Sequence, residues 1–114
     1  MNVYDKAHEL ARAFRESQEL RELKRIKNTV FSSSKSKEMI TDFKKKQFEL
    51  QTGQLAGKEP EKEKLDQLQQ LYSILIANPE ISKYFEAEYR FDSMVSDIYK
   101  ILGESIGVDQ ELIK

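Results

Sequence analysis

The side chains of this sequence that could support acid–base or metal chemistry are its carboxylates and a single histidine, His8. A general base or a metal ligand needs partner groups, and no nucleophile or second histidine lies at a recognisable spacing from His8. Glu86 and Glu88 would point to different faces of a helix. The histidine is also not part of the Glu-x-x-His unit that builds di-metal sites in helix bundles. We therefore predict no catalytic residue, no metal site and no cofactor.

The sequence also lacks the short motifs of common enzyme classes. It has no glycine-rich phosphate loop, no G-x-G-x-x-G and no G-x-S-x-G. Cysteine is absent, which excludes disulfides, thiolate metal sites and a cysteine nucleophile. We predict that the protein is not an enzyme.

The hydropathy pattern indicates a protein of the cytoplasm. No apolar run approaches the roughly 20 residues needed to span a bilayer. The first residues, MNVYDKAHELARAF, contain no uninterrupted apolar segment of the kind found in secretory signals. We expect cytoplasmic localisation without membrane insertion.

Composition and spacing both predict an all-α fold. The chain is long enough for one domain, 1–114, with one modest core, and it has few glycines and prolines. Apolar residues return every three or four positions, which is the period of an amphipathic helix. The helices are expected at about 3–28, 34–55, 60–77 and 79–106, and the segment VDQELIK is either a last turn or a loose tail. In the first helix the apolar stripe slips by three residues near Ser17, like a stammer in a coiled coil.

Residues typical of helix ends support these boundaries. Ser33 or Ser34 is the expected N-cap of the second helix, and Gly57 fits the position just after its end. Pro60 is expected as the first residue of the third helix. Asn78 and Pro79 should cap and begin the fourth.

Short connections favour antiparallel neighbours. We therefore expect two long antiparallel hairpins, the first helix with the second and the third with the fourth. Only 39% of the residues are hydrophobic and 34% are charged, so one copy can bury little surface. The bundle is expected to be completed by homo-oligomerisation, as a dimer or larger. The predicted oligomer seam consists of Leu10, Phe14, Phe43, Tyr84, Glu88, Phe91 and Val95.

Glu88 is the unusual member of this seam, because it lies between Tyr84 and Phe91 on an apolar stripe. A single polar residue in such a seam can fix the register of an oligomer. Two other interpretations remain open, a solvent-facing edge and a contact with a ligand or partner. Tyr89 and Tyr99 lie off the main stripe and could form an exposed patch for another protein.

Basic residues are concentrated around the turn between the first two predicted helices. They include Arg21, Lys24, Arg25, Lys44, Lys45 and Lys46. Gathered at one end of a hairpin they could contact the phosphates of RNA. The alternative is a solvated surface, since no aromatic platform is interleaved with these charges.

Several stretches resemble the YlbF/YmcA family of small helical bacterial proteins, and in particular its YheA-like branch. They are VYDKAHELARAFRESQELRELKRIK, FKKKQFELQ, the break GKEP, LQQLY and NPEISKYFEAEYRF. The resemblance extends from about Val3 to Ile106. It implies an all-helical, cytosolic protein that self-associates, commonly as a dimer. The better-studied branches of the family regulate competence, sporulation and biofilm formation, in a complex that influences messenger-RNA processing. Cysteines linked to iron–sulfur clusters in that complex have no counterpart here, so we expect no cluster.

Two functional hypotheses follow. The first is a non-enzymatic, homo-oligomeric interaction protein, for example a regulatory adaptor similar to those regulators. The second is an accessory factor that contacts RNA through the basic end of the first hairpin. The expected partners are a second copy of the chain and another protein, with nucleic acid as the alternative.

Overall fold

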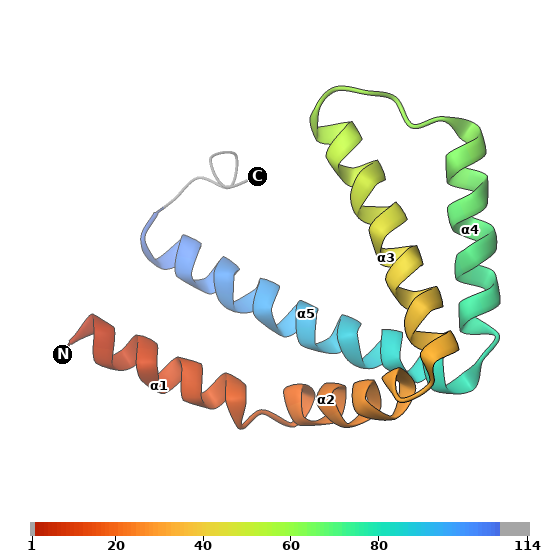
Figure 1. The fold of residues 1–114 in the computed structure, drawn as a ribbon. Helices are drawn as coiled ribbons and strands as arrows, with labels where there is room; N and C mark the ends of the chain where they lie inside the picture. Colours follow the sequence, from red (N-terminus) through yellow and green to blue (C-terminus); the bar gives the residue numbers. More distant parts are fainter. Residues whose placement is uncertain (1, 108–114) are drawn as a thin grey trace. The chain divides into compact units, whose positions relative to one another are not determined.

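The computed structural model describes residues 2–107, and all regular secondary structure within them is helical (Figure 1). The prediction of an all-α fold is confirmed. The helices are α1 (Val3–Arg15), α2 (Gln18–Phe31), α3 (Ser34–Leu55), α4 (Lys62–Ile76) and α5 (Pro79–Ser105). The expectation for VDQELIK lies outside the described residues. No helix in the described range is both long and apolar enough to cross a bilayer.

The chain divides into two compact units. The central unit is Arg25–Tyr84 and contains the end of α2, all of α3 and α4, and the start of α5. The terminal unit contains α1, the first part of α2 as far as Lys24, and α5 from Phe85 onward.

The first predicted helix is two helices, so the prediction of a continuous helix over 3–28 was wrong. The side chain of Ser17 stabilises the break from both sides. Its hydroxyl donates to the carbonyl of Phe14 (2.7 Å) and accepts from the N–H of Leu20 (3.2 Å). The guanidinium of Arg21 also donates to the carbonyl of Glu16. Ser17 therefore ends α1 and caps α2, where the apolar stripe slips by three residues.

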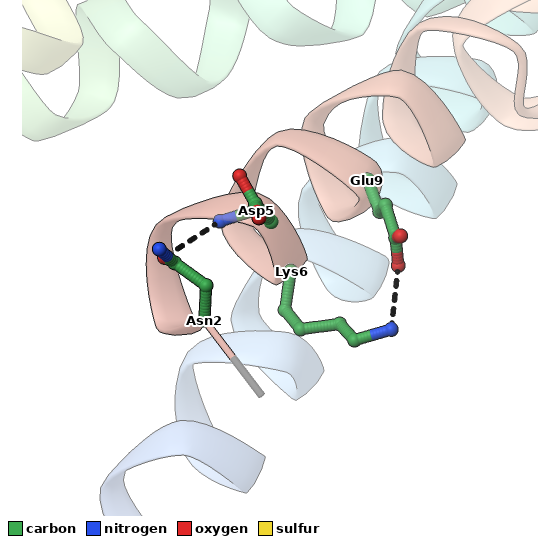
Figure 2. A network of polar contacts seen from close by, with 4 residues as sticks. All are labelled: Asn2, Asp5, Lys6 and Glu9. Carbon is green, nitrogen blue, oxygen red and sulfur yellow. Dashed lines mark hydrogen bonds and ion pairs between the residues drawn. The ribbon is translucent and has the colours of Figure 1, made fainter.

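The start of α1 is capped by a residue that the sequence analysis did not identify. Asn2 accepts from the N–H groups of Tyr4 (2.8 Å) and Asp5 (3.3 Å) through Oδ1. Figure 2 shows this cap beside the exposed ion pair between Lys6 and Glu9, whose N–O distance is 3.2 Å. The cap satisfies two N–H groups that no turn of the helix can satisfy.

Both ends of α3 follow the predicted signals. Ser33 Oγ accepts from the N–H of Ser36 (3.3 Å), which confirms Ser33 as the N-cap. At the other end, Gly57 has φ of +83°. The N–H of Lys58 bonds to the carbonyl of Gly53 (2.9 Å) and that of Gly57 to the carbonyl of Gln54 (3.0 Å). This is a Schellman motif, and it requires the left-handed conformation that glycine adopts most easily.

The starts of α4 and α5 differ from each other. The predicted start of α4 at Pro60 was wrong, because Glu61 is still extended (φ −67°, ψ 134°) and the helix begins at Lys62. The prediction for α5 is confirmed, since Pro79 is its first residue. Asn78 Oδ1 accepts from the N–H groups of Glu80 (2.9 Å) and Ile81 (3.4 Å).

The central unit is built on an antiparallel hairpin of α3 and α4 (Figure 1). Residues 56–61, which we call the linker, connect the two helices of this hairpin. The predicted pairing put these two helices in separate hairpins, so that part of the prediction was wrong. Rings of Phe43 on α3 and Tyr72 on α4 lie 5.6 Å apart. The buried side chains of the unit are Ile26, Val30, Ile40, Phe43, Leu75, Ile81 and Tyr84. They come from all four helices of the unit and form its core.

The terminal unit is more open. Its helix α1 runs alongside the later part of α5 in the opposite direction (Figure 1). Phe14 and Phe91 meet edge to face, with ring centroids 6.4 Å apart. No residue of α1 is buried. The apolar side chains of α1 are therefore only partly covered within one chain.

Candidate interaction surfaces

Residues 2–107 bring no three His, Cys, Asp or Glu side chains together in an arrangement that could hold a metal ion. His8 lies on an exposed position of α1. The features that could support a function are surfaces instead.

An apolar groove of about 370 Å³ lies between α1 and α5 in the terminal unit. It is lined by Ala7, Leu10, Ala11, Phe14, Phe91, Val95, Ile98, Tyr99 and Leu102. No lining residue carries a charge. Four residues of the predicted seam meet here, namely Leu10, Phe14, Phe91 and Val95, and all four are half-buried.

Two other residues of the predicted seam lie in the core of the central unit. Phe43 is 6% exposed and Tyr84 is 2% exposed. The ring of Tyr84 packs against that of Phe31 at 5.6 Å, and its hydroxyl accepts from Lys44 Nζ at 2.7 Å. Both aromatic residues are covered within a single chain, so they are not available to a second copy in this structure.

The last member of the predicted seam, Glu88, is half-buried on α5. The buried stripe of this helix runs from Ile81 through Tyr84 to Ala87, with only 2% of Ala87 exposed. Ala87 and Glu88 are three and four residues after Tyr84, and either spacing continues a helical stripe. The alanine takes the buried position and the carboxylate lies beside it. Ala87 was not among the predicted seam residues, although its small apolar side chain three residues after Tyr84 was a signal in the sequence.

The basic residues do not share one face. Lys44, Lys45 and Lys46 are consecutive on α3, so their side chains leave the helix about 100° apart. Lys44 reaches Tyr84, whereas Lys46 forms an ion pair with Asp42 at 2.7 Å. Lys45 is exposed. On α2, Arg21 bonds to a backbone carbonyl, and Lys24 and Arg25 are exposed.

The far part of the α3–α4 hairpin is a second surface with apolar side chains. We call residues 44–74 the arm, and none of them is buried. Its exposed large apolar residues include Phe48 (68% exposed), Leu55, Leu65 and Ile74. Two helices in contact without a buried side chain are weakly held by packing. The arm is thus a surface that another molecule could cover.

A hollow of about 340 Å³ lies where α3, the linker and α4 meet. Its charged lining consists of Lys46, Lys58, Lys64, Glu49, Glu59 and Glu61. Three ammonium groups and three carboxylates balance each other, so the hollow favours neither anions nor cations.

Comparison with known proteins identifies relatives over nearly the whole chain. Residues 3–107 match the family model described as "Control of competence regulator ComK, YlbF/YmcA". A UPF0342 protein of Caldicellulosiruptor bescii is 45% identical over 111 residues, which are 97% of this chain and 93% of the relative. A UPF0342 protein of Symbiobacterium thermophilum is 41% identical over 112 residues, covering 98% of this chain and all of the relative.

Two solved structures have the same fold. YheA from Bacillus subtilis superposes with a TM-score of 0.69 at 25% identity, covering 94% of this chain and 97% of YheA. A protein of unknown function (DUF964) from Bacillus stearothermophilus gives a TM-score of 0.81 at 18% identity, with 92% of each chain covered. At that identity the second likeness shows the fold alone. With the family match over residues 3–107, these findings show that the chain belongs to the YlbF/YmcA family.

Proposed function

We propose that this protein is a non-enzymatic regulatory protein of the cytoplasm that self-associates and acts by binding another protein. The observation that supports this best is the uncovered apolar groove between α1 and α5. Regulation is suggested by the family, whose model is described as a control of the competence regulator ComK. A regulatory adaptor would account both for the apolar groove and for the regulatory description of the family.

The physical reason is the cost of leaving apolar surface in water. Each 100 Å² of apolar area removed from water contributes about 2.5 kcal/mol of favourable free energy. In a single chain the groove and the arm leave large side chains exposed on two surfaces. A protein with two such surfaces can hold a copy of itself on one and a different protein on the other, as an adaptor does.

Self-association is tested by sedimentation of the purified protein at micromolar concentrations. We expect a dimer or larger. A folded monomer throughout this range would contradict the self-association.

Binding of another protein is tested by affinity capture from bacterial extract at physiological salt, with a matched pair of arm variants. Phe48→Glu and Gln47→Glu each add one negative charge at neighbouring exposed positions of α3. We expect a reproducible partner with the wild type and with Gln47→Glu, and its loss with Phe48→Glu, because a charge replaces an apolar contact. If the wild type and both variants capture the partner equally well, the arm is not the surface that binds it.

Contact with RNA has less support. Lys44, Lys45 and Lys46 point in different directions, and Lys46 is already paired with Asp42. Binding to several phosphates must weaken steeply between about 50 and 200 mM salt. A gel-shift series in which binding falls over that range, and falls further in Lys45→Gln, would favour the RNA hypothesis over the adaptor.

A further inference from the structure

The arm has two sides that differ in chemistry. One side carries the charged hollow, whose lining includes Lys46 on α3 and Gln67 on α4. Side chains two residues apart leave a helix in nearly opposite directions, because consecutive residues are about 100° apart. Phe48 lies two residues after Lys46, and Leu65 lies two residues before Gln67. Phe48 and Leu65 therefore lie on the side of the hairpin that is opposite to the hollow.

This opposite side is apolar and has the same pattern on both helices. Each helix contributes two large apolar residues with a glutamine between them, at steps of three and four residues. These residues are Phe48, Gln51 and Leu55 on α3, and Leu65, Gln69 and Tyr72 on α4. We call them the apolar face, and its four apolar members are between 42% and 90% exposed. None of the six carries a charge, although 34% of the residues of the chain do. An exposed surface rich in aromatic residues and depleted in charge is typical of the centre of a protein interface.

The apolar face continues a surface of the hairpin that helices already cover at its base. Lys44 lies one turn before Phe48 on the same side of α3, and it donates to the hydroxyl of Tyr84 on α5 (2.7 Å). The ring of Tyr72 contacts that of Phe43, which is buried in the central core. Helices α3 and α4 then extend side by side beyond the end of α2 and the start of α5 (Figure 1). The side that packs against helices at the base is thus open along the arm.

We propose that the apolar face binds an amphipathic α-helix of another protein, which lies along α3 and α4 as a third helix. A groove between two antiparallel helices accommodates the apolar stripe of a further helix. Phe48 and Leu55 are seven residues apart, about 10 Å along the helix axis, so the bound segment needs about two to three turns. Its contact stripe is apolar and uncharged, because the apolar face offers no charge to pair with. The inference rests on the adaptor role proposed above and names the class of partner.

Two substitutions on α4 provide a matched test. Leu65→Glu and Gln67→Glu each add one negative charge at an exposed position, the first on the apolar face and the second beside the hollow. The probe is a dilute, fluorescently labelled synthetic helix of about three heptads, with leucine at the a and d positions and alanine, glutamate and lysine elsewhere. A scrambled peptide of the same composition is its control.

The measurement is the dissociation constant of the probe by fluorescence anisotropy, with circular dichroism to verify the helix content of each variant. We expect wild type and Gln67→Glu to bind equally well. Leu65→Glu should bind about tenfold more weakly or worse, because it places an unpaired charge in an apolar contact. If Leu65→Glu loses helicity, Phe48→Glu on α3 replaces it. Binding should stay nearly constant between about 50 and 200 mM salt, whereas contact with phosphates weakens steeply over this range.

Several results would overturn the inference. They are no binding of the probe to wild type, equal binding of the scrambled peptide, equal binding by both variants, and a steep loss of binding with salt. Sedimentation without the probe supplies another: if Leu65→Glu reduces the oligomer size and Gln67→Glu does not, a second copy of the chain covers the apolar face.

Failure of this inference can be distinguished from failure of the adaptor role. A protein captured from extract that Leu65→Glu retains and Gln67→Glu loses would overturn the apolar face as its binding surface and leave the adaptor role standing. Probe binding that Leu65→Glu weakens, together with no captured protein, would overturn the adaptor role and leave the apolar face as a helix-binding surface.

Discussion

Replacement of Ser17 by alanine is expected to destabilise the junction of α1 and α2. One hydroxyl makes two hydrogen bonds there, as donor to the carbonyl of Phe14 and as acceptor from the N–H of Leu20. Loss of an N-cap costs about 1 kcal/mol. Loss of the second bond adds about 0.5–1.5 kcal/mol, towards the lower end here because Ser17 is half-buried and water can reach it. The expected fall in the free energy of unfolding is about 1–2 kcal/mol.

The assay is urea unfolding followed by circular dichroism at one fixed protein concentration, because self-association changes the apparent stability. Ser33→Ala is the matched control, since Ser33 is exposed and its hydroxyl accepts a single capping bond from Ser36. It should lose about 0.5–1 kcal/mol. Ser17→Asp keeps an acceptor for Leu20 but has no proton to donate to Phe14, so its stability should lie between wild type and Ser17→Ala. A Ser17→Ala protein as stable as Ser33→Ala, or one with higher helix content than wild type, would refute this account of the junction.

Other substitutions test the core and the turn after α3. Leu75→Ala removes a side chain with no exposed surface from the central core and should lower the free energy of unfolding by about 2–5 kcal/mol. Ile74 is 59% exposed, so Ile74→Ala should change it by no more than about 0.5 kcal/mol. Chemical unfolding measures both variants. Gly57→Ala forces alanine to φ of +83° and should cost about 1–2 kcal/mol in the same assay. Gly53→Ala is its counterpart, because Gly53 lies inside α3 with open space around it, and this change should stabilise by about 0.5–1 kcal/mol. Equal effects at the two glycines would contradict the left-handed turn as the reason for Gly57.

The helix ends that could be predicted are those whose signals are local. Asn78, Ser33 and Gly57 act through hydrogen bonds and backbone angles within a few residues of themselves, so the sequence nearby contains the necessary information. The junction at Ser17 was visible only as a slip in the apolar stripe. Such a slip fits an overwound continuous helix as well as a break. The break is stabilised by the Ser17 hydroxyl, which donates one hydrogen bond and accepts another. The spacing of apolar residues contains no information about these two bonds.

The candidate site was harder to predict, for a different reason. Apolar spacing identifies which side chains of a helix avoid water, but it does not say what covers them. Phe43 and Tyr84 had the same spacing signal as Leu10 and Phe91, yet the first two lie in a core formed by one chain. Glu88 is a second case in which spacing does not identify the buried residue. A stripe that advances by three or four residues from Tyr84 fits Ala87 and Glu88 equally well. Only the three-dimensional packing selects the alanine.

Helix α5 shows how stability and association can be separated in this fold. Its first turns contribute Ile81 and Tyr84 to a core that is complete in one chain, whereas its later turns line the open groove from Phe91 to Leu102. A change at Tyr84 acts on unfolding because the ring loses contacts with Phe31 and Lys44 whether or not a partner is present. A change at Tyr99 acts on assembly, because its side chain is exposed until something covers the groove. If the groove is the interface, substitutions along this one helix should change from effects on stability to effects on oligomer size between Ala87 and Phe91.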